Sequence, residues 1–458
     1  MEGLEISEIK MSFLKKENRT FRIDSNFFIK KSLSVDNKIK SMNHFYISEE
    51  NIVSGPFGSS LKSDAYLNAG VPFIRIENIK NGFSISTDNL IYISEFDNSR
   101  LKSSQLFEDD LILSKVGNTI GYYARVDSNI KNCNISENNI GIKLNSYNRD
   151  VKHYIMTFLN SKYGNILTLR RISGNAQPKL NVFDISEIPI PQFNEEFYKK
   201  ISDRIIKADE LKQHSKSLYS QAEDLLLGEL GLKDWRPKNT LHTTKKFSDF
   251  AQSGRLDAEY YQPKYDDLFE KLSCLNCKRL GKIVSIKKSF DPGSDAYQET
   301  GIPFIRVSDI SKDGIEKTEL HLSPIDFDIP ELKPKKDTIL FSKDGSIGIA
   351  YKVQSDLNVF TSGALLHLVT TDSSILPDYL TLILNSVVVK LQAERDSNGA
   401  IIQHWKPSDI ENVIIPILPE SIQTKIASLI QQSFECRAQS KQLLEDAKRM
   451  VEAEIEKN

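Results

Sequence analysis

The sequence contains no uninterrupted apolar run approaching the roughly 18 residues that a membrane-spanning helix requires. Its N-terminal residues, MEGLEISEIKM, lack the apolar core of a secretory signal peptide. Only four cysteines occur among 458 residues, which is too few for a disulfide framework. Together these absences predict a cytoplasmic protein in a reducing compartment.

The chain also has little net charge, because 60 basic and 62 acidic side chains leave −2. A protein that coats nucleic acid nonspecifically needs a large positive excess, so the composition disfavours that class. A protein that reads a DNA sequence needs only a local basic surface, and partner subunits can supply further phosphate contacts. With 39% apolar and 27% charged residues, the chain is expected to form two or three folded domains.

The common catalytic signatures are missing as well. A P-loop requires a second glycine where Leu61 stands before Lys62-Ser63, and no Pro-Pro dipeptide is present for an amino-methyltransferase tetrapeptide. The segment Glu331–Lys333 resembles one arm of a nuclease site but lacks its upstream aspartate, so a solvated turn is expected. Cys274 and Cys277 lack the two further ligands of structural zinc. We therefore expect no catalytic residue and no metal site.

What the sequence does contain is an internal duplication. The pattern SDAY-x3-G-x-PFIR occupies Ser63–Arg75 and again Ser294–Arg306, at a constant offset of 231 residues (63 to 294 and 75 to 306). Nine identities at fixed spacing are not expected by chance, and a period this long excludes solenoid repeats of roughly 20–50 residues. The match continues in three more pairs of segments: Phe21–Asp24 with Gly254–Asp257, Ile112–Gly121 with Ile339–Gly348, and Asp184-Ile185 with Asp409-Ile410.

Each copy is predicted to begin with a mixed, strand-rich domain. Val71–Ile76 and Asp110–Ser114 have the composition of short strands, and Ser54–Ser60 is punctuated by glycine and proline as a loop. Apolar residues spaced three and four apart predict a helix over Asp150–Leu169 and another over Pro377–Glu394.

Each copy is predicted to end with a long amphipathic helix. Apolar and small residues step by three and four from Ile426 to Met450, and again from Leu211 to Leu225, as in the seam of a coiled coil. Small residues recur in both seams and permit close approach of two helices; they are Ser215, Ala222, Ser440 and Ala447. Two independent surface helices are the alternative, but the shared seam favours an antiparallel pair.

The order of these parts predicts an α+β chain of four segments. A first domain covers residues 1–193 and a long helix covers 194–232, with Gly231 as its C-cap. A linker and a second domain cover 233–418, and a second long helix covers 419–458.

Several segments resemble the specificity subunits of type I restriction–modification systems. Gly55–Lys62, followed by Gly-Val-Pro-Phe-Ile-Arg, looks like the beginning of their target recognition domains. Asp110–Lys115 with Gly117 and Gly121 resembles their next segment, and Ile172–Asn181 with Ile188–Pro191 resembles the one before the long helix. The resemblance covers nearly the whole chain. The second copy departs from it at Ser289–Gly293 and Ile401–Trp405.

The resemblance implies two similar mixed α/β target recognition domains, joined by two long antiparallel coiled-coil helices with pseudo-twofold symmetry. Each domain would read one half of a bipartite site in double-stranded DNA. Two methyltransferase subunits would dock on this scaffold and restriction subunits would join them, forming a site-specific deoxyribonuclease and adenine methyltransferase. This chain would be non-catalytic and bind no cofactor, whereas its partners would use S-adenosylmethionine, ATP and Mg²⁺.

Three alternatives remain at this point. The chain could serve a related system in which methylase and nuclease share one partner chain. It could be a coiled-coil adaptor that binds only protein, or it could contain its own nuclease or methylase centre.

DNA readout requires loop side chains that pair with base edges or donate to phosphates. Candidates of this kind in the first copy are Ser59, Ser60, Lys62, Lys115, Asn118, Gln177 and Lys179, and in the second copy Lys343, Ser346, Gln403, His404 and Lys406. Arg75 and Arg306 also recur, but alternation along a strand would place Arg75 on the face of Phe73 and Glu77. A structural hydrogen-bonding role is therefore predicted for Arg75.

Overall fold

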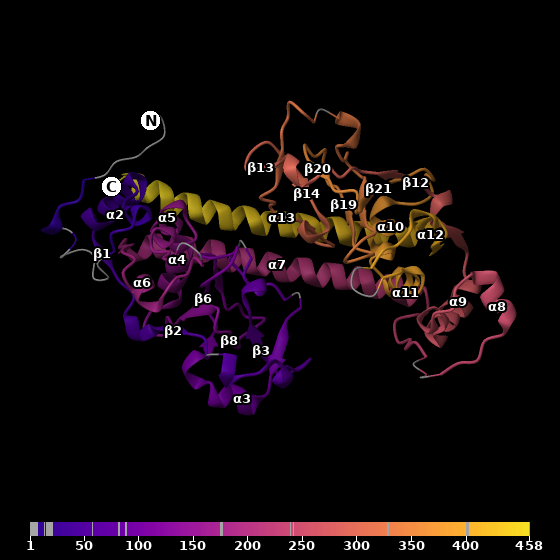
Figure 1. Cartoon of the computed structure of the whole chain (residues 1–458), viewed down its shortest axis with the longest axis horizontal. Helices are drawn as coiled ribbons and strands as arrows, with labels where there is room; N and C mark the ends of the chain where they lie inside the picture. The colour runs from indigo at the N-terminus through magenta and orange to yellow at the C-terminus, as the bar shows by residue number, and fades with distance from the viewer. Residues whose placement is uncertain are drawn as a thin grey trace. The chain divides into compact units, whose positions relative to one another are not determined.

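The computed structural model describes residues 8–12, 14, 22–56, 58–80, 83–87, 89–174, 177–238, 240, 242–327, 329–399 and 403–457 (Figure 1). The chain forms two compact units, one of Met1–Leu211 with Ala438–Asn458 and the other of Lys212–Arg437. Within the described ranges, no helix combines the length and apolar character needed to cross a membrane. The fold is α+β, as expected.

The first unit contains two four-stranded sheets. The antiparallel sheet has the order β2 (Ile52–Ser54), β9 (Asn139–Ile142), β6 (Leu111–Ser114) and β7 (Tyr123–Arg125). The mixed sheet has the order β4 (Ile91–Ile93), β3 (Val71–Ile74), β8 (Asn132–Ile135) and β5 (Leu106–Phe107), with β3 and β8 parallel. Every residue of β6 and β9 is buried, because both faces of this sheet are covered.

Helices and a short strand pair complete the first unit. The strand pair is β1 (His44–Phe45) with β10 (Ile190–Pro191). The helices are α2 (Lys30–Ser41), α3 (Glu95–Arg100), α4 (Arg149–Leu159), α5 (Lys162–Arg170), α6 (Val182–Ser186) and the beginning of α7 (Glu195–Glu229). One apolar cluster joins Leu111 and Ile140 of the antiparallel sheet to Tyr154 of α4 and Ile201 of α7.

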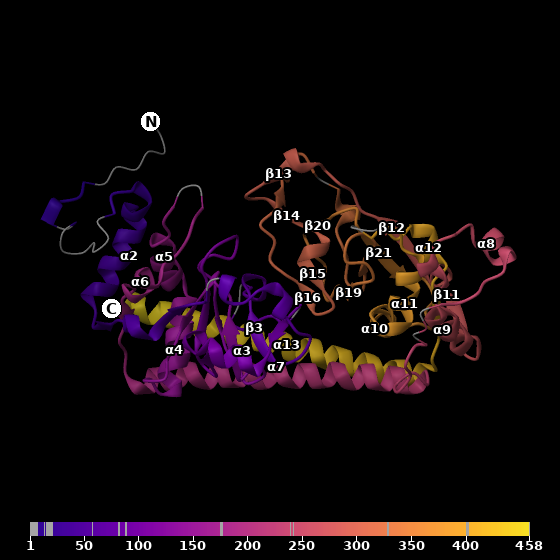
Figure 2. The same cartoon turned by 60° about the horizontal axis from the view of Figure 1, so that its bottom comes forward.

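The second unit has the same two kinds of sheet (Figure 2). Its antiparallel sheet has the order β12 (Val284–Lys288), β21 (Leu365–Thr370), β18 (Ile339–Ser342) and β19 (Ala350–Lys352). Its mixed sheet has the order β13 (Tyr297–Gln298), β17 (His321–Leu322), β14 (Ile302–Ile305) and β20 (Phe360–Thr361), with β14 and β20 parallel. Shorter pairs are β11 (Cys277–Arg279) with β22 (Ile414–Pro416) and β15 (Ile310–Ser311) with β16 (Gly314–Ile315).

The helices of the second unit are α8 (Phe247–Ser253), α9 (Pro263–Ser273), α10 (Pro377–Leu384), α11 (Val387–Asp396), α12 (Pro407–Glu411), the end of α7 and the beginning of α13 (Glu420–Lys457). The predicted C-cap of the first long helix is confirmed. Gly231 has φ +67°, and the Leu232 N–H donates to Leu227 O at 2.8 Å, which ends α7 as a glycine cap does.

Asp150–Leu169 and Pro377–Glu394 are helical, as predicted, but each segment forms two helices. Asn160 ends α4, and the Ser161 Oγ caps α5 by accepting the Gly164 N–H at 3.3 Å. The same Asn-Ser pair separates α10 from α11, where the Ser386 Oγ accepts the Val388 N–H at 3.3 Å. A serine at the N-cap satisfies an otherwise unpaired backbone donor and starts a new helix.

The prediction that Arg75 lies within a strand is also wrong. Strand β3 ends at Ile74, and the Asn78 Oδ1 accepts the Arg75 N–H at 3.0 Å to form a short 3-10 turn. The Arg75 guanidinium donates to Asn89 O at 3.2 Å and forms an ion pair with Glu77.

The two long helices contact each other through small residues within each unit. In the first unit the Ser440 Oγ donates to Ala208 O at 2.7 Å. In the second unit the Ser433 Oγ donates to Ser215 O at 2.8 Å. Side chains this small allow one helix backbone to lie within hydrogen-bonding distance of a serine on the other.

Candidate nucleic-acid interface

A buried serine shapes the loop between β6 and β7. The Ser114 hydroxyl donates to Val116 O at 3.2 Å and shares a hydrogen bond of 2.8 Å with Thr119. Gly117 has φ +80°, a backbone conformation that residues with a Cβ rarely adopt. The loop therefore has a fixed path, with Asn118 exposed at its tip and Lys115 half-buried at its base.

The loop between β18 and β19 has the same construction in the second unit. The Ser342 hydroxyl donates to Ser346 O at 2.6 Å and accepts the Ile349 N–H at 2.8 Å. Gly345 has φ +72°. Ser346 is exposed at the tip and Lys343 is half-buried at the base, in the places of Asn118 and Lys115.

A second loop packs beside the first one in each unit. In the first unit the Leu180 N–H donates to Lys115 O at 3.0 Å, and Lys179 pairs with Val116 in a β-bridge. In the second unit the Trp405 N–H donates to Lys343 O at 2.8 Å, and His404 pairs with Asp344. Within each unit the adjoining loops thus bring predicted residues together. In the first unit they are Lys115, Asn118, Gln177 and Lys179, and in the second Lys343, Ser346, Gln403, His404 and Lys406. All are exposed except Lys115 and Lys343, which are half-buried.

The two units differ in charge at this pair of loops. Asp344 forms an ion pair with Lys343 and a 2.8 Å contact with the His404 Nδ1. Burial alone would raise the pKa of Asp344, but hydrogen bonds from Lys343 and His404 lower it below its usual value. Val116 takes the place of Asp344 in the first unit, and the Lys115 Nζ donates instead to the Ser54 Oγ at 3.4 Å.

The three remaining candidates lie on another segment of the first unit. Ser60 and Lys62 are exposed, and Ser60 O accepts from the Arg100 Nη2 at 2.8 Å. The side chain of Ser59 lies outside the described part of the chain, as do Ile401 and Ile402 of the second unit.

Sequence reasoning missed the turn that joins this segment to the Lys115 loop. The turn lies between β8 and β9, where the Glu137 Oε2 accepts the Gly58 N–H at 2.7 Å and Asn138 O accepts the Lys115 N–H at 2.9 Å. The only local signal was a polar Ser-Glu-Asn-Asn run between two apolar strands. A hollow of about 260 Å³ beside the turn is lined by Arg75, Glu77 and both turn residues, among others.

In the equivalent contact of the second unit, the carboxylate and the N–H donor change places between the turn and the loop. Here the carboxylate comes from the loop, because the Asp291 Oδ1 accepts the Gly363 N–H at 2.9 Å. The backbone link to the lysine loop is kept, since the Lys343 N–H donates to Ala364 O at 2.9 Å. The departure of Ser289–Gly293 from the first copy therefore changes the groups presented beside a preserved framework.

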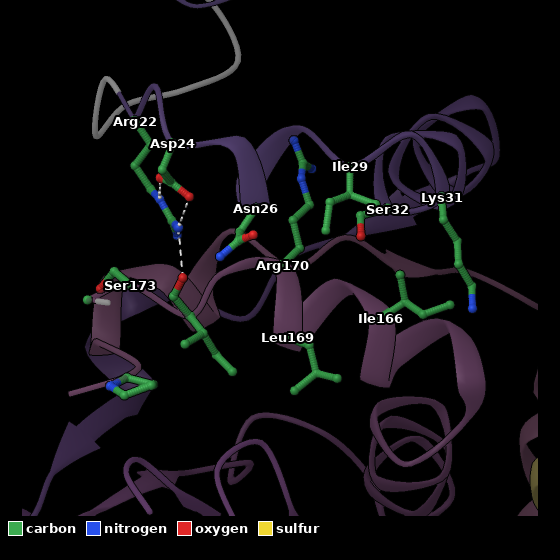
Figure 3. Close-up of a pocket in the computed structure, with 13 residues that line it drawn as sticks. Arg22, Asp24, Asn26, Ile29, Lys31, Ser32, Ile166, Leu169, Arg170 and Ser173 are labelled. Atoms are coloured by element: carbon green, nitrogen blue, oxygen red, sulfur yellow. Dashed lines mark hydrogen bonds and ion pairs between the residues drawn. The ribbon is translucent and has the colours of Figure 1, made fainter. Parts of the chain in front are cut away.

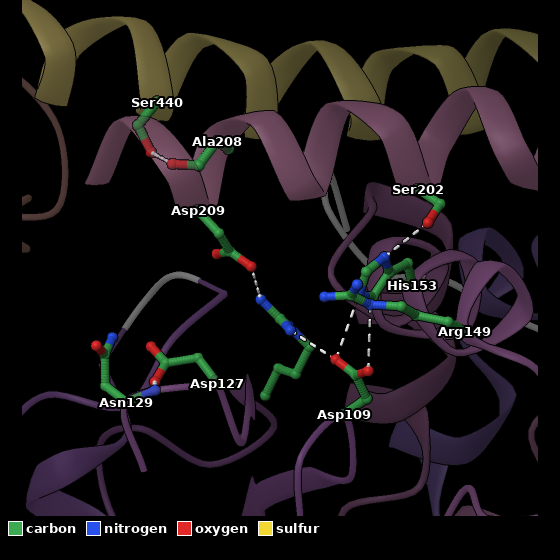
Figure 4. Close-up of polar contacts among 10 residues, drawn as sticks. Asp109, Asp127, Asn129, Arg149, His153, Ser202, Ala208, Asp209 and Ser440 are labelled. Atoms are coloured by element: carbon green, nitrogen blue, oxygen red, sulfur yellow. Dashed lines mark hydrogen bonds and ion pairs between the residues drawn. The ribbon is translucent and has the colours of Figure 1, made fainter. Parts of the chain in front are cut away.

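A buried polar network joins β7, the strand that follows the Lys115 loop, to the long helix α7 (Figure 4). Arg125 of β7, whose side chain is 3% exposed, donates to the Asp109 Oδ1 at 2.6 Å and forms an ion pair with Asp209 of α7. The His153 Nε2 lies 3.2 Å from the same Asp109 oxygen, and its Nδ1 lies 2.9 Å from the Ser202 hydroxyl on α7.

The charges in this network shift the ionisation of its members. Burial would raise the pKa of Asp109, but a hydrogen bond from His153 and the charge of Arg125 hold that pKa well below its usual range. Burial lowers the pKa of His153. In the second unit a lysine replaces the arginine: the Lys352 Nζ lies 3.1 Å from Asp337 and 3.2 Å from Asp378, which accepts from Gln431 of α13 at 2.9 Å.

Comparison with known proteins identifies the family. The family model described as the type I restriction modification DNA specificity domain matches residues 276–449. A curated protein, the type I restriction enzyme MjaIX specificity subunit of Methanocaldococcus jannaschii, is 27% identical over 402 residues, with 84% of each chain covered. Residues 276–449 therefore match the type I specificity-domain family, and the chain over most of its length is similar to a type I specificity subunit. The resemblance seen in the sequence is thereby confirmed.

Solved structures of specificity subunits are also similar. The type I S subunit from M. genitalium is 15% identical, with a TM-score of 0.39 and coverage of 90% of this chain and 95% of that one. The HsdS subunit from Thermoanaerobacter tengcongensis is 14% identical, with a TM-score of 0.29 and coverage of 89% and 95%. The range matched by the family model contains all five candidate residues of the second unit.

Proposed function

We propose that this specificity subunit recognises a bipartite DNA site, with one target recognition domain for each half. The observation that carries the proposal is the pair of loops built in the same way in both units but with different exposed side chains. Asn118 and Lys179 in the first unit correspond to Ser346 and His404 in the second. Amide, hydroxyl, ammonium and imidazole groups pair with different base edges, so the two domains would read different half-sites.

The domains of the proposal cover residues 1–193 and 233–418, and the long helices cover 194–232 and 419–458. The antiparallel sheets of the two units share one strand order, and both mixed sheets contain one parallel pair, β3 with β8 and β14 with β20, which supports a duplicated domain. The pairing of Ala208 with Ser440 and of Ser215 with Ser433 supports an antiparallel coiled coil. A helix of 35 residues extends about 50 Å, and a stiff spacer of that length would fix the distance between half-sites.

The DNA contacts of the proposal come from the twelve candidate residues on the loops, together with Glu137 and Asn138 of the missed turn. Lysines would contact phosphates, and Asn118, Gln177, Gln403 and the turn residues would contact base edges.

The chemistry of the proposed complex belongs to its other subunits. Two methyltransferase subunits and restriction subunits would bind S-adenosylmethionine, ATP and Mg²⁺, and this subunit would place them on the DNA. A duplicated scaffold suits two identical partners, because each copy offers one an equivalent surface. A protein-only adaptor and a recognition subunit for a fused partner are not favoured, since the matching family and relative are of type I.

The test is selection of bound duplexes from a randomised DNA library, using the chain together with its cognate methyltransferase subunit. The expected product is two short motifs separated by a spacer of fixed length and free sequence. Gln177→Ala should change only one motif and Gln403→Ala only the other, so each variant carries its own internal control. A library without any enriched sequence, with and without the methyltransferase, would overturn the proposal.

A further inference from the structure

Each unit holds an aliphatic side chain almost wholly in solvent at the same position of the duplicated sequence. Ile23 is 82% exposed and Leu256 is 81% exposed. They stand in the matched segments Arg22–Asp24 and Arg255–Asp257, between an arginine and an aspartate. An exposed aliphatic residue is unremarkable when single. Its presence in both copies, at the same place, calls for a physical reason.

In each segment the flanking arginine and aspartate pair with each other and form a rigid turn, called a corner below: Arg22–Asp24 in the first unit and Arg255–Asp257 in the second. The Arg22 Nε and Nη2 donate to the two Asp24 carboxylate oxygens at 2.8 and 2.9 Å (Figure 3). The Arg255 Nε and Nη2 donate to the two Asp257 oxygens at 2.6 and 2.5 Å. Two parallel charge-assisted hydrogen bonds fix both partners, so the residue between them has little freedom to fold back.

Each corner is also fastened to its own unit. Arg22 donates to Arg171 O at 2.9 Å and to Ile172 O at 2.7 Å, just after α5. Arg255 makes the corresponding, longer contact to Asp396 O at 3.4 Å, at the end of α11. The aliphatic side chains are therefore presented from a fixed base.

An aromatic ring between two arginines completes each corner. The guanidinium carbons of Arg22 and Arg170 lie 4.8 and 4.2 Å from the Phe27 ring centroid. In the second unit the guanidinium carbons of Arg255 and Arg395 lie 4.9 and 4.2 Å from the Tyr260 ring centroid. These distances are those of cation–π contacts, so the same sandwich occurs twice.

A basic hollow lies beside each corner. The first, of about 730 Å³, is lined by Arg22, Lys31 and Arg170, with Asp24 as its acidic residue. The second, of about 470 Å³, is lined by Arg255, Arg395 and Lys406 as well as two aspartates. In the first hollow Arg22 pairs with Asp24 and Arg170 pairs with Asp36, so Lys31 is the group that would accept a carboxylate from a partner.

The duplication identifies the kind of partner. The loops that differ between the units suit different half-sites, whereas a corner that is the same in both suits a component that meets both. Within the proposed function, on which this step rests, that component is the methyltransferase subunit. An isoleucine or leucine offers no hydrogen bond to a phosphate or a base, but it stabilises a protein interface when covered.

We propose that the corners Arg22–Asp24 and Arg255–Asp257 are two equivalent docking points for methyltransferase subunits. The complementary surface on the partner is an apolar depression flanked by carboxylates. Each subunit covers one aliphatic side chain and places an acidic side chain at the adjoining hollow.

The test uses the full chain with its cognate methyltransferase subunit and the variants Ile23→Ser, Leu256→Ser and the double variant. Native mass spectrometry gives the number of methyltransferase subunits bound, and calorimetry gives their affinity. Each single variant should weaken one of the two binding events about tenfold, as loss of a buried interface anchor does, and the double variant should weaken both. Lys31→Glu, which reverses a charge at the first hollow, should weaken the event that Ile23→Ser weakens.

The matched control is Leu67→Ser. Leu67 is 43% exposed, and the second copy has Gln298 at its position, so it is not duplicated and should leave methyltransferase binding unchanged. Equal melting temperatures will show that the variants fold, because none of these side chains is buried.

The outcomes separate this inference from the function on which it rests. If the unmodified chain binds neither the methyltransferase nor a split DNA site, the proposed function itself is overturned. If the unmodified complex forms and reads DNA while the variants bind methyltransferase as tightly, the docking proposal alone is overturned. Variants that keep the methyltransferase but lose DNA affinity would assign the corners to DNA, which also overturns it.

Discussion

Arg125 of β7 forms an ion pair with Asp209 of α7, although 84 residues separate them in the sequence. The guanidinium is almost wholly buried and also donates to Asp109. It thus joins the antiparallel sheet of the first unit to the long helix.

The network makes Arg125→Ala strongly destabilising. Removing one member of a buried ion network leaves the carboxylate of Asp109 without its main cation, which costs about 3 kcal/mol in the free energy of unfolding. Urea unfolding measures this cost. Lys200→Ala is the control, because Lys200 forms a solvent-exposed pair with Glu196 on the same helix, so its loss should leave the free energy of unfolding almost unchanged. Equal effects of the two variants would contradict a stabilising role for the buried network of Arg125.

Sequence patterns could not have predicted this network. The duplication follows from repeated spacing, and the strands predicted over Val71–Ile76 and Asp110–Ser114 follow from local composition. The structure confirms both strands, as Val71–Ile74 and Leu111–Ser114. Arg125 and Asp209, by contrast, belong to different elements with no shared spacing, so only the tertiary fold brings them together. The same holds for Glu137 and Gly58.

The helix breaks are a different case, because their signal was present in the sequence. Asn160-Ser161 and Asn385-Ser386 are an end-and-cap pair, but the apolar periodicity continues across both, and periodicity alone predicted one helix. In both segments the Asn-Ser pair therefore ends one helix and starts the next, although the apolar spacing continues across it.

His367 gives the protein a predictable dependence on pH. It is buried on β21 beside Thr361, at 2.8 Å, and burial, reinforced by the charge of Lys287, lowers its pKa to about 4. The unfolded chain takes up this proton near the ordinary pKa of about 6.5, whereas the folded chain does not until about 4. Stability is therefore full above pH 6.5, falls between 6.5 and 4 by about 3 kcal/mol, and changes no further from this group below 4.

The measurement is urea unfolding at pH 7 and pH 5 for the wild type and His367→Gln. Glutamine keeps a hydrogen-bonding side chain at this position but does not titrate, so the variant should lose the share of the pH-dependent difference that comes from His367, while His153, whose pKa burial also lowers, keeps its own share. The same slope in both proteins would show that other groups cause it.

Asp344→Asn tests the charge difference between the two pairs of loops. The carboxylate holds Lys343 and His404, and the variant frees both while removing one negative charge from the surface. DNA binding at low salt should strengthen about threefold on unrelated sequences, with a steeper salt dependence, while discrimination at the second half-site falls. Fluorescence anisotropy on cognate and scrambled duplexes at two salt concentrations measures both effects. Asp356→Asn, at an exposed aspartate paired with Lys335, should change neither.

Gly345→Ala separates the shape of a recognition loop from its stability. Gly345 has φ +72° and a Cβ there would meet no atom within 4 Å, so the substitution adds backbone strain of about 1 kcal/mol without a clash. Gly231 has φ +67° with equally open space at the end of α7, so Gly231→Ala adds the same strain away from the loops. Both variants should lose about 1 kcal/mol in urea unfolding.

Only Gly345→Ala should impair DNA selection, and only in the second motif, because the strain moves Ser346 and the backbone beneath His404. Selection that is unchanged in both variants would mean that the β18–β19 loop takes no part in readout. Selection impaired equally by Gly231→Ala would mean that lost stability, rather than loop shape, limits recognition. The two glycines thus decide whether the conformation of this loop carries sequence information.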